Sequence, residues 1–590
     1  MSGLHEPGVS RTPLCLRAAV LIALVAMLSG ANGLVNGFLG DDLWLLRASS
    51  ERLSLLAVFS PSYWSDTHPA PSTAYRPVRT LSFALDQAAF GLHPFGYHLG
   101  NLILHAACSL LVFALVKRIS QRQGVALFAA LLFATHPVHV EAVAYVKNRA
   151  ELLACLFYLA AFCLFLRRGL VCQLATLAAF ALALLSKEMA ATLPFILVLY
   201  ILLLGRARHP SPVTRHLLPA HTLPFWAMLA LYLVLRFALV ETEGVVPERR
   251  PVVTAAAHVA AVADTLAFYA RVLTLPVHLC VHRLMPLPSS LLEPAVSLLG
   301  VALVVAVAMG VVRDRRFAFW MVWLFLAMLP AANILYHPWR PVAEQRMYIP
   351  SVGFCAALGL LAAGRGPGPR RAAALCGVVG LLALGTIGRG FAWKDEFTLQ
   401  TDAVRKSPQN PKVHADLAKE YQALGHPRRA MRQQEWRLRA ARPWELDAAH
   451  YELGRNYEEL AELTRALGEY EAAIRAFPKF VEPHVAAGRV HARLGQETAA
   501  VDAWQRAIEL DPRCAPAHVN LALVHLKRGE LDAAQQCAQK ALDADRALPD
   551  AHFALGLIAK SRGRPAEAAE RFRQALKLDP SFKPALQELK

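Results

Sequence analysis

Apolar runs long enough to cross a lipid bilayer recur along the first two thirds of this chain and end near Phe391. A helix needs about 20 mostly apolar residues to span roughly 30 Å of hydrocarbon. The first run, from Leu14 to Leu39, has one charged residue, Arg17, near its start. From about Lys394 onward such runs stop and charged residues become dense. The chain therefore divides into a membrane part and a water-exposed part.

The apolar runs predict about eleven membrane spans, with a domain boundary in the break at 392–410. Ala255–Leu275 contains His258, Asp264 and Arg271, so we expect it to be re-entrant or interfacial rather than a twelfth span. An odd number of spans places the two ends of the chain on opposite sides. The predicted spans lie near 14–36, 97–116, 125–135, 150–166, 171–186, 189–204, 222–240, 295–312, 317–335, 350–364 and 372–391.

The formal net charge of +18 does not indicate nucleic-acid binding, because the basic residues are scattered at the ends of apolar runs. Examples are Lys117–Arg118, Arg167–Arg168 and Arg315–Arg316 in short connectors. Such connectors are typical of the cytoplasmic side of a membrane protein. The partners predicted on this ground are membrane lipid and no nucleic acid.

Polar, aromatic and histidine residues gather in the remaining connectors, which this topology places on the outer face. Asp41 and Asp42 follow the first span directly, and the others lie in 40–96, 136–151, 186–188 and 336–351. Ionisable groups near membrane depth are expensive, so their convergence on one face predicts a chemical site. The alternative is that each group only pairs with a neighbour and pins helices together.

The water-exposed part has a 34-residue period, which is the length of the tetratricopeptide (TPR) repeat. Asp511–Pro512 and Asp579–Pro580 stand at repeat ends, and small residues keep step at Gly454, Gly488, Ala522 and Gly556. About five repeats are predicted from 410 to 580. Such a solenoid has a concave face that usually binds peptides or proteins. Because the last span ends outward, the repeats are expected to share a compartment with Asp41 and Asp42.

The predicted fold class is therefore all-α, with a polytopic membrane helix bundle followed by a TPR α-solenoid. The predicted domains are 1–391 for the membrane bundle, 392–409 for a linker, 410–580 for the repeats and 581–590 for a C-terminal cap.

Four motifs carry a resemblance to a known family. They are YRPVRTLSFALDQAAFGLHPFGYHLGNLILHAACSLLV (75–112), LLFATHPVHVEAVAYVKNRAELLACLFYL (131–159), ALLSKEMAATLP (183–194) and PVAEQRMYIPSVGF (341–354). With the aspartate pair before them and TPRs after them, they resemble the transmembrane and TPR repeat-containing O-mannosyltransferases and their bacterial relatives. The resemblance covers nearly the whole chain. It implies a GT-C glycosyltransferase that uses a polyprenyl-phosphate-linked sugar, with a catalytic acid in the first outer loop.

The implied chemistry is displacement at the anomeric carbon of a lipid-linked sugar by a Ser or Thr hydroxyl of a protein acceptor. Either Asp41 or Asp42 is the expected base, and repulsion between adjacent carboxylates is expected to raise one pKa. The departing phosphate requires cations, for which Lys187 and Arg346 are favoured over Arg76, Lys147, Arg149 and Arg340. Gln345 departs from the family, where many relatives have Arg after the Glu. The predicted substrate-binding residues are Tyr75, Arg76, His98, His136, His139, Glu141, Arg149, Lys187, Glu188, Glu344 and Arg346.

No cofactor and no metal ligand are predicted. His136, His139 and Glu141 form an H-x-x-H-x-E cluster, but Pro137 breaks the helix that a zinc pair would need. These groups are expected to bind sugar hydroxyls or phosphate, or to lock loops together. A divalent cation stays open, because some GT-C enzymes use one.

Two other classes of function remain. One is a membrane-anchored TPR scaffold without catalysis, and the other is a transferase that builds polysaccharide or glycolipid. The predicted location is a bacterial inner membrane, with the repeats on the periplasmic side and the acceptor protein bound by their groove.

Overall fold

The computed structural model describes residues 12–43, 45–46, 76–167, 169–205, 213–239, 255–283, 314–332, 342–363 and 368–589, and its regular elements in these ranges are all helices. The predicted all-α class is confirmed. The chain forms two compact units, Met1–Ser407 and Pro408–Lys590. The predicted span at 295–312 and the predicted site residue Tyr75 lie outside the described residues.

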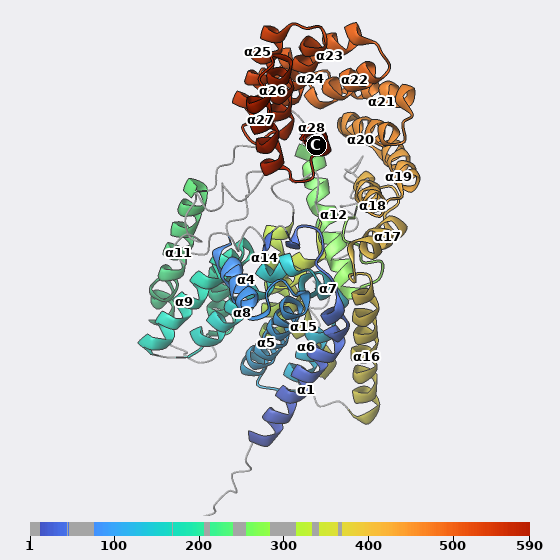
Figure 1. Cartoon of the computed structure of the whole chain (residues 1–590). Coiled ribbons are helices and arrows are strands. Elements are labelled where there is room, and N and C mark those ends of the chain that lie inside the picture. Colours follow the sequence, from blue (N-terminus) through green and yellow to red (C-terminus); the bar gives the residue numbers. More distant parts are fainter. Residues whose placement is uncertain are drawn as a thin grey trace, which may run out of the picture. The chain divides into compact units, whose positions relative to one another are not determined.

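The first unit contains α-helices joined by short 3-10 turns (Figure 1). In order, these elements are α1 (Thr12–Gly30), η1 (Ala31–Val35), α4 (Pro77–Phe90), α5 (Pro94–Ser120), α6 (Gln123–Thr135), η3 (Pro137–His139), α7 (Val140–Ala144), η4 (Val146–Asn148), α8 (Arg149–Phe165), α9 (Leu170–Ser186), η5 (Glu188–Thr192), α10 (Leu193–Leu203), α11 (Val213–Leu239), α12 (Ala255–Thr274), α14 (Arg315–Met328), η8 (Leu329–Ala331), η9 (Glu344–Met347), α15 (Pro350–Ala363), α16 (Pro369–Phe391) and α17 (Glu396–Lys406).

The ends of α5 show how the sequence sets helix bounds. Pro94 stands in the first turn, where a missing backbone N–H costs little. Lys117 and Arg118 lie in the last turn, where positive charge favours the helix dipole. Gln121 then ends the helix in the left-handed conformation, with φ at 58°.

Four helical segments among the described residues are long and apolar enough to cross a membrane: Cys15–Val35, Pro94–Ser120, Val146–Phe165 and Pro369–Phe391. The pair Gln123–Thr135 and Pro137–Ala144, bent by 49° where Pro137 interrupts the helix, makes a fifth if it is one broken span. The predicted total of about eleven is thus not confirmed, because the other apolar helices in the described ranges are shorter. The segment expected to be re-entrant is the continuous helix α12.

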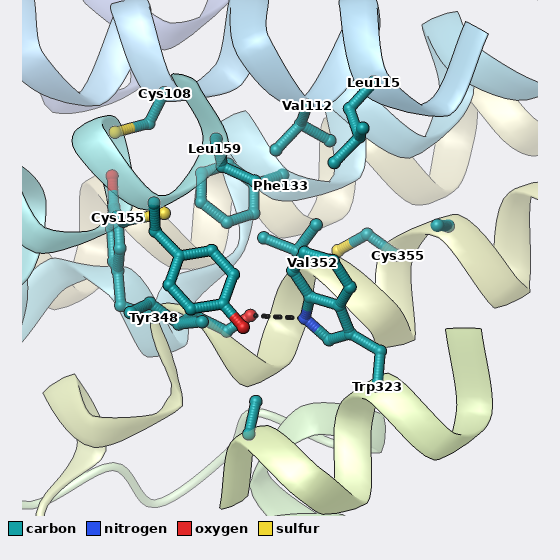
Figure 2. Packing of buried hydrophobic residues seen from close by; sticks show 14 of the residues in the cluster. Cys108, Val112, Leu115, Phe133, Cys155, Leu159, Trp323, Tyr348, Val352 and Cys355 are labelled. Atoms are coloured by element: carbon teal, nitrogen blue, oxygen red, sulfur yellow. Dashed lines mark hydrogen bonds between the residues drawn. The ribbon is translucent and has the colours of Figure 1, made fainter. Parts of the chain in front are cut away.

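The core of the first unit lies where α5, α6, α8, α14 and α15 pack together. Figure 2 shows Trp323 of α14 among Val352, Cys355 and Leu159, with its indole N–H donating to the Ile349 carbonyl at 3.2 Å. This hydrogen bond satisfies the one polar atom of a fully buried ring.

Two glycines let α15 approach its neighbours. A Cβ at Gly353 would lie 2.5 Å from the Trp320 carbonyl of α14, and one at Gly359 would lie 2.8 Å from the Val125 carbonyl of α6. Small residues at such positions allow the close backbone packing on which membrane helices depend. By contrast, Leu24 and Leu28 of α1 and Leu381 of α16 are more than half exposed, as expected of helix faces that meet lipid.

The second unit is a stack of helical hairpins, which Figure 1 shows in orange to dark red. Between 408 and 589 it contains five hairpins and a short last helix. They are α18 (Pro411–Ala423) with α19 (Pro427–Ala440), α20 (Leu446–Glu459) with α21 (Leu463–Ala476), α22 (Val481–Arg493) with α23 (Glu497–Leu510), α24 (Ala515–Lys527) with α25 (Leu531–Ala544), α26 (Pro549–Ser561) with α27 (Pro565–Leu578), and α28 (Lys583–Glu588), with the turn η10 (Pro443–Glu445) before α20. The predicted solenoid is confirmed.

The predicted linker, 392–409, contains α17, which belongs to the first unit. Trp393 is fully buried, and Asp395 begins α17 by accepting a hydrogen bond from the Thr398 N–H at 2.8 Å. Most of the segment is therefore an anchored helix rather than an open connector.

In the four hairpins from α20 to α27, the repeated small residue on the first helix matches the size of its partner on the second helix. Gly454, Gly488 and Gly556 face Tyr470, Trp504 and Phe572, which would lie 2.4 to 2.7 Å from an added Cβ. Where the repeat has Ala522 instead, a small residue, Ala538, is buried on the second helix of that hairpin. Each hairpin thus keeps its close helix packing by exchanging volume between the two positions.

We predict that Gly488→Ala destabilises the third hairpin by about 1–3 kcal/mol through overpacking. The Trp504 ring is held by its N–H donating to the Val485 carbonyl at 3.1 Å, so it cannot move away cheaply. Hydrogen exchange of peptides from α22 and α23 in the full chain measures the effect. The matched control is Gly468→Ala in α21, where an added Cβ meets nothing within 4 Å and the better helix propensity of alanine stabilises by about 0.5–1 kcal/mol. Equal effects of the two changes would contradict this account.

Candidate functional site

The loop after α1 and η1 turns sharply at Gly40 and directs two carboxylates differently. Gly40 has φ at +48°, and a Cβ there would lie 2.9 Å from the Tyr145 hydroxyl. Glycine is therefore required at this turn. The Asp41 side chain is 62% exposed, whereas Asp42 is fully buried. The two aspartates, which the sequence left equivalent, have different environments.

Lys147 of η4 holds both aspartates. Its backbone N–H donates to Oδ1 of Asp42 at 2.8 Å, while the Leu39 N–H donates to Oδ2 at 3.1 Å. Its ammonium group forms an ion pair with Asp41. Because backbone groups fix Asp42 and a mobile side chain contacts Asp41, the geometry of Asp42 is the more rigid.

Burial raises the pKa of Asp42 to about 7, against the lowering by the Leu39 and Lys147 N–H groups and by the Lys147 charge. The sequence predicted a raised pKa from repulsion between the two carboxylates. The charge of Asp41 does act in that direction, but it is the smallest of these causes. The desolvation of Asp42 is therefore what places this pKa near neutrality.

The end of α16 and the start of α17 hold the aspartate loop from its other side. The Asn32 side-chain amide donates to the Ile387 carbonyl at 2.9 Å, and the Gly37 N–H donates to the Lys394 carbonyl at 3.0 Å. The Gly40 N–H donates to Oε2 of Glu396 at 2.7 Å. The loop after α1 and the segment after α16 therefore lie at the same end of the helix bundle.

Arg149, a predicted substrate ligand, is enclosed by protein groups. It is buried and forms an ion pair with Asp86 of α4 at 2.5 Å. Its remaining N–H groups donate to the Asn101 side chain at 2.7 Å and to the Tyr97 carbonyl at 2.8 Å. Five donors in a rigid fork suit a guanidinium to joining α4, α5 and α8.

The predicted group Arg76, Lys187 and Glu188 does lie together, but as two ion pairs. Lys187 pairs with Glu151 of α8, and both side chains are buried. Arg76 pairs with Glu188 at 3.3 Å and keeps 16% of its side chain exposed. Lys187 therefore does not pair with its sequence neighbour Glu188, and the ion pair of Arg149 is with Asp86.

The predicted histidines are buried and hydrogen-bonded to the protein. His136 donates to the Leu273 carbonyl at 2.9 Å, His139 contacts the Phe133 carbonyl at 2.8 Å and the Ser351 hydroxyl at 2.9 Å, and His98 donates to the Gly37 carbonyl at 3.3 Å. His98 alone of these has a buried nitrogen, Nδ1, without a hydrogen-bond partner. These contacts favour the expectation that the histidines lock loops together.

The residues of η9 connect three segments. The Gln345 amide, with its nitrogen facing Glu141, donates to both carboxylate oxygens at 2.6 Å. Glu344 accepts from the Cys280 N–H at 2.5 Å and lies 3.8 Å from Arg389 of α16, and burial raises its pKa to about 7. Arg346 keeps partial exposure. Gln345 thus serves as a neutral hydrogen-bond partner for the buried Glu141 carboxylate.

A small cavity of about 30 Å³ lies between α1, α5, the η3 turn and α16. Its polar lining includes Asn32, His98, His105, His136, His139 and Thr386. His98 of this lining donates to the carbonyl of Gly37 in the aspartate loop. This hydrogen bond connects the histidine cluster to the loop, while Arg76, Lys187 and Glu188 are not among the residues that line the cavity.

Within the described ranges, no group of three or more His, Cys, Asp or Glu side chains is placed to hold a metal ion. The absence of a metal ligand and the participation of a divalent cation both stay predictions. The contribution of Glu396 was missed from the sequence, since it follows the last span by a few residues and has no distinguishing motif.

We predict that Glu396→Ala loosens the aspartate loop, because the Gly40 N–H loses its charged acceptor. A hydrogen bond to a charged group is worth about 1.5–3 kcal/mol, so exchange of the Gly40 amide should quicken by about tenfold or more. Hydrogen exchange of peptides covering 36–43 in the full chain measures it. Glu396→Gln keeps an acceptor but loses the charge, so its exchange rate should lie between those of the native chain and of Glu396→Ala. Asp395→Ala removes only the cap of α17, so an equal loosening by that variant would refute a role for the carboxylate itself.

The comparisons with known proteins agree with both units. Family models described as tetratricopeptide repeat match residues 451–519 and 513–581. A human protein named Protein O-mannosyl-transferase TMTC3 is 27% identical over 514 residues, which are 79% of this chain and 56% of that protein. The Caenorhabditis elegans protein named Protein O-mannosyl-transferase F38B6.6 is 28% identical over 395 residues, which are 62% and 54% of the two chains.

Among solved structures, one titled "Crystal structure of MamA protein" has 23% identity and a TM-score of 0.25, covering 29% of this chain and 93% of that one. The present chain spans about half the length of the curated relatives that it matches. The resemblance predicted from the motifs is confirmed: the chain is a relative of proteins named protein O-mannosyl-transferases and has TPR repeats in its C-terminal region.

Proposed function

We propose that this protein is a membrane glycosyltransferase that moves mannose from a polyprenyl-phosphate donor to Ser or Thr hydroxyls of a protein acceptor. The observation that supports it most is the exposed Asp41 carboxylate, beside Lys147 and the buried Asp42, at the end of a membrane helix. A base and a cation at headgroup level suit a reaction between a lipid-linked sugar and a water-exposed hydroxyl. The names of the relatives supply the sugar and the acceptor class.

In this proposal Asp41 is the base, because an acceptor hydroxyl can reach it while Asp42 is fully buried. Asp41 takes the hydroxyl proton as the oxygen bonds to the anomeric carbon. The bond from that carbon to the phosphate oxygen breaks, and its electron pair leaves with the polyprenyl phosphate. One base and inversion at the anomeric carbon are sufficient for this displacement. Asp42 holds the loop through its two backbone hydrogen bonds.

The departing phosphate needs cations with accessible surface. Lys147, Arg76 and Arg346 keep part of their surface exposed, whereas Arg149 and Lys187 are buried in ion pairs. We therefore assign this role to the first three and give Arg149 and Lys187 the role of supports. The predicted contacts of His98, His136, His139, Glu141, Glu188 and Glu344 with substrate remain proposals; Tyr75 lies outside the described residues.

In this proposal the TPR groove binds the acceptor protein. The aspartate loop lies on the periplasmic side of a bacterial inner membrane. One hydrogen bond supports this arrangement. The Gly37 N–H donates to the carbonyl of Lys394, so the segment that leads to the repeats begins at the same end of the bundle as Asp41. An acceptor held by the repeats would then be on the correct side for the base.

We predict that Asp41→Asn lowers the initial rate of transfer by about 10²–10⁴-fold, the usual contribution of a general base. Membranes from expressing cells, supplied with radiolabelled synthetic polyprenyl-phosphate mannose, report the label that enters membrane proteins. Asp314→Asn is the matched control, since Asn caps α14 as Asp does. Full transfer by Asp41→Asn would remove the proposed base, and no transfer by the native chain would favour the scaffold alternative.

The raised pKa of Asp42 predicts how the rate depends on pH. Below about pH 7 the buried carboxyl is protonated, and above it the carboxylate accepts both backbone N–H groups that fix the loop. The initial rate at low donor concentration should therefore rise with pH through about 7. Asp42→Asn cannot ionise, so its profile should lack this step even if its rate is lower. An unchanged step in that variant would assign the titration to another group.

A further inference from the structure

The second helix of the first repeat, α19, differs from the other helices of the array in its charge. Its exposed positions are Arg428, Arg429, Arg432, Trp436 and Arg439. At 3.6 residues per turn, these five positions fall within an arc of roughly 100°. The one acidic residue of α19, Glu435, is half-buried at the edge of this arc and accepts from the Tyr457 hydroxyl of α20 at 3.5 Å. The arc itself therefore contains only basic and aromatic side chains.

The arginines of this face have no carboxylate partner among the residues that the structure describes. Several exposed arginines elsewhere in the array are paired: Arg465 with Glu462, Arg475 with Glu471 and Arg506 with Glu509. On α19 two of the four exposed guanidiniums lie near rings, Arg439 at 5.2 Å from the centre of Trp436 and Arg429 at 5.9 Å from that of Tyr421. The face thus has unneutralised charge as well as an exposed aromatic side chain.

We propose that this face of α19 binds anionic phospholipid headgroups. Guanidinium groups match the geometry of lipid phosphates, and a Trp between them suits the boundary of headgroups and acyl chains. Trp436 is 53% exposed, and Leu424 in the turn before α19 is 55% exposed. The combination of basic and apolar side chains on one face is that of an interfacial helix.

The position of α19 in the chain favours lipid over an acidic protein. α16, a candidate membrane span, ends at Phe391, and α19 begins at Pro427. A surface tethered this closely meets the membrane at a high effective concentration, whereas a separate protein has to arrive by diffusion. The basic face would hold the first repeat at the membrane surface and so fix the orientation of the repeats. This inference does not rest on catalysis.

Hydrogen exchange of the full chain in lipid nanodiscs tests it. With phosphatidylcholine nanodiscs as reference, adding about one third phosphatidylglycerol should slow exchange of peptides from 424–440 by about fivefold. The effect should disappear at about 0.5 M salt, which screens surface charge.

The variant Arg428→Gln/Arg432→Gln should lose the effect of phosphatidylglycerol. The control Arg465→Gln/Arg475→Gln removes two exposed arginines from α21 and should keep it. Equal exchange in the two lipids, or the same loss in both variants, would overturn the proposal. Slowing by added poly-glutamate but not by phosphatidylglycerol would also overturn it and indicate an acidic protein partner.

Discussion

The hydrogen bonds between the loop after α1 and the segment after α16 determine how the first unit presents its charged groups. Two of them are backbone-anchored, Gly37 to the Lys394 carbonyl and Gly40 to the Glu396 carboxylate. They join residues more than 350 positions apart in sequence. Because of them, the exposed Asp41, the buried Asp42 and the helix that precedes the repeats occupy one end of the bundle. The proposed assignment of base, cation and acceptor site depends on these hydrogen bonds.

The ion pairs of the first unit are of two kinds, buried and exposed. Arg149 and Lys187 are enclosed, each with a carboxylate partner, and removing one partner from such a pair is costly. Asp41 and Lys147 form a pair that keeps 62% and 36% of the side chains exposed. The first kind fixes α4, α8 and α9 in place. In the proposed mechanism, the second kind exchanges its partner for a substrate.

Much of the fold could be predicted because periodicity and hydropathy are local properties. The repeat register at Gly454, Gly488, Ala522 and Gly556 predicted the hairpins, and the apolar runs predicted the helices around Trp323. The pairing of charges could not be predicted in this way. Lys187 pairs with Glu151 and Arg149 with Asp86 because helices distant in sequence meet there. Asp41 and Asp42 differ in burial, and the burial of each side chain is set by the tertiary fold alone. The basic face of α19 was not recognised from the sequence, because basic residues are scattered along the rest of the chain.

The central claim is that the aspartate loop and the repeats lie on the same side of the membrane. It is tested by placing single cysteines at Leu43, which is 41% exposed, and at Ser581, which is exposed at the end of the array. An impermeant maleimide added to intact cells should react with both, measured as the increase over the unsubstituted chain, and reaction with neither would contradict the proposed periplasmic side. Labelling of one position with protection of the other would place the proposed base and the repeats in different compartments and contradict the account.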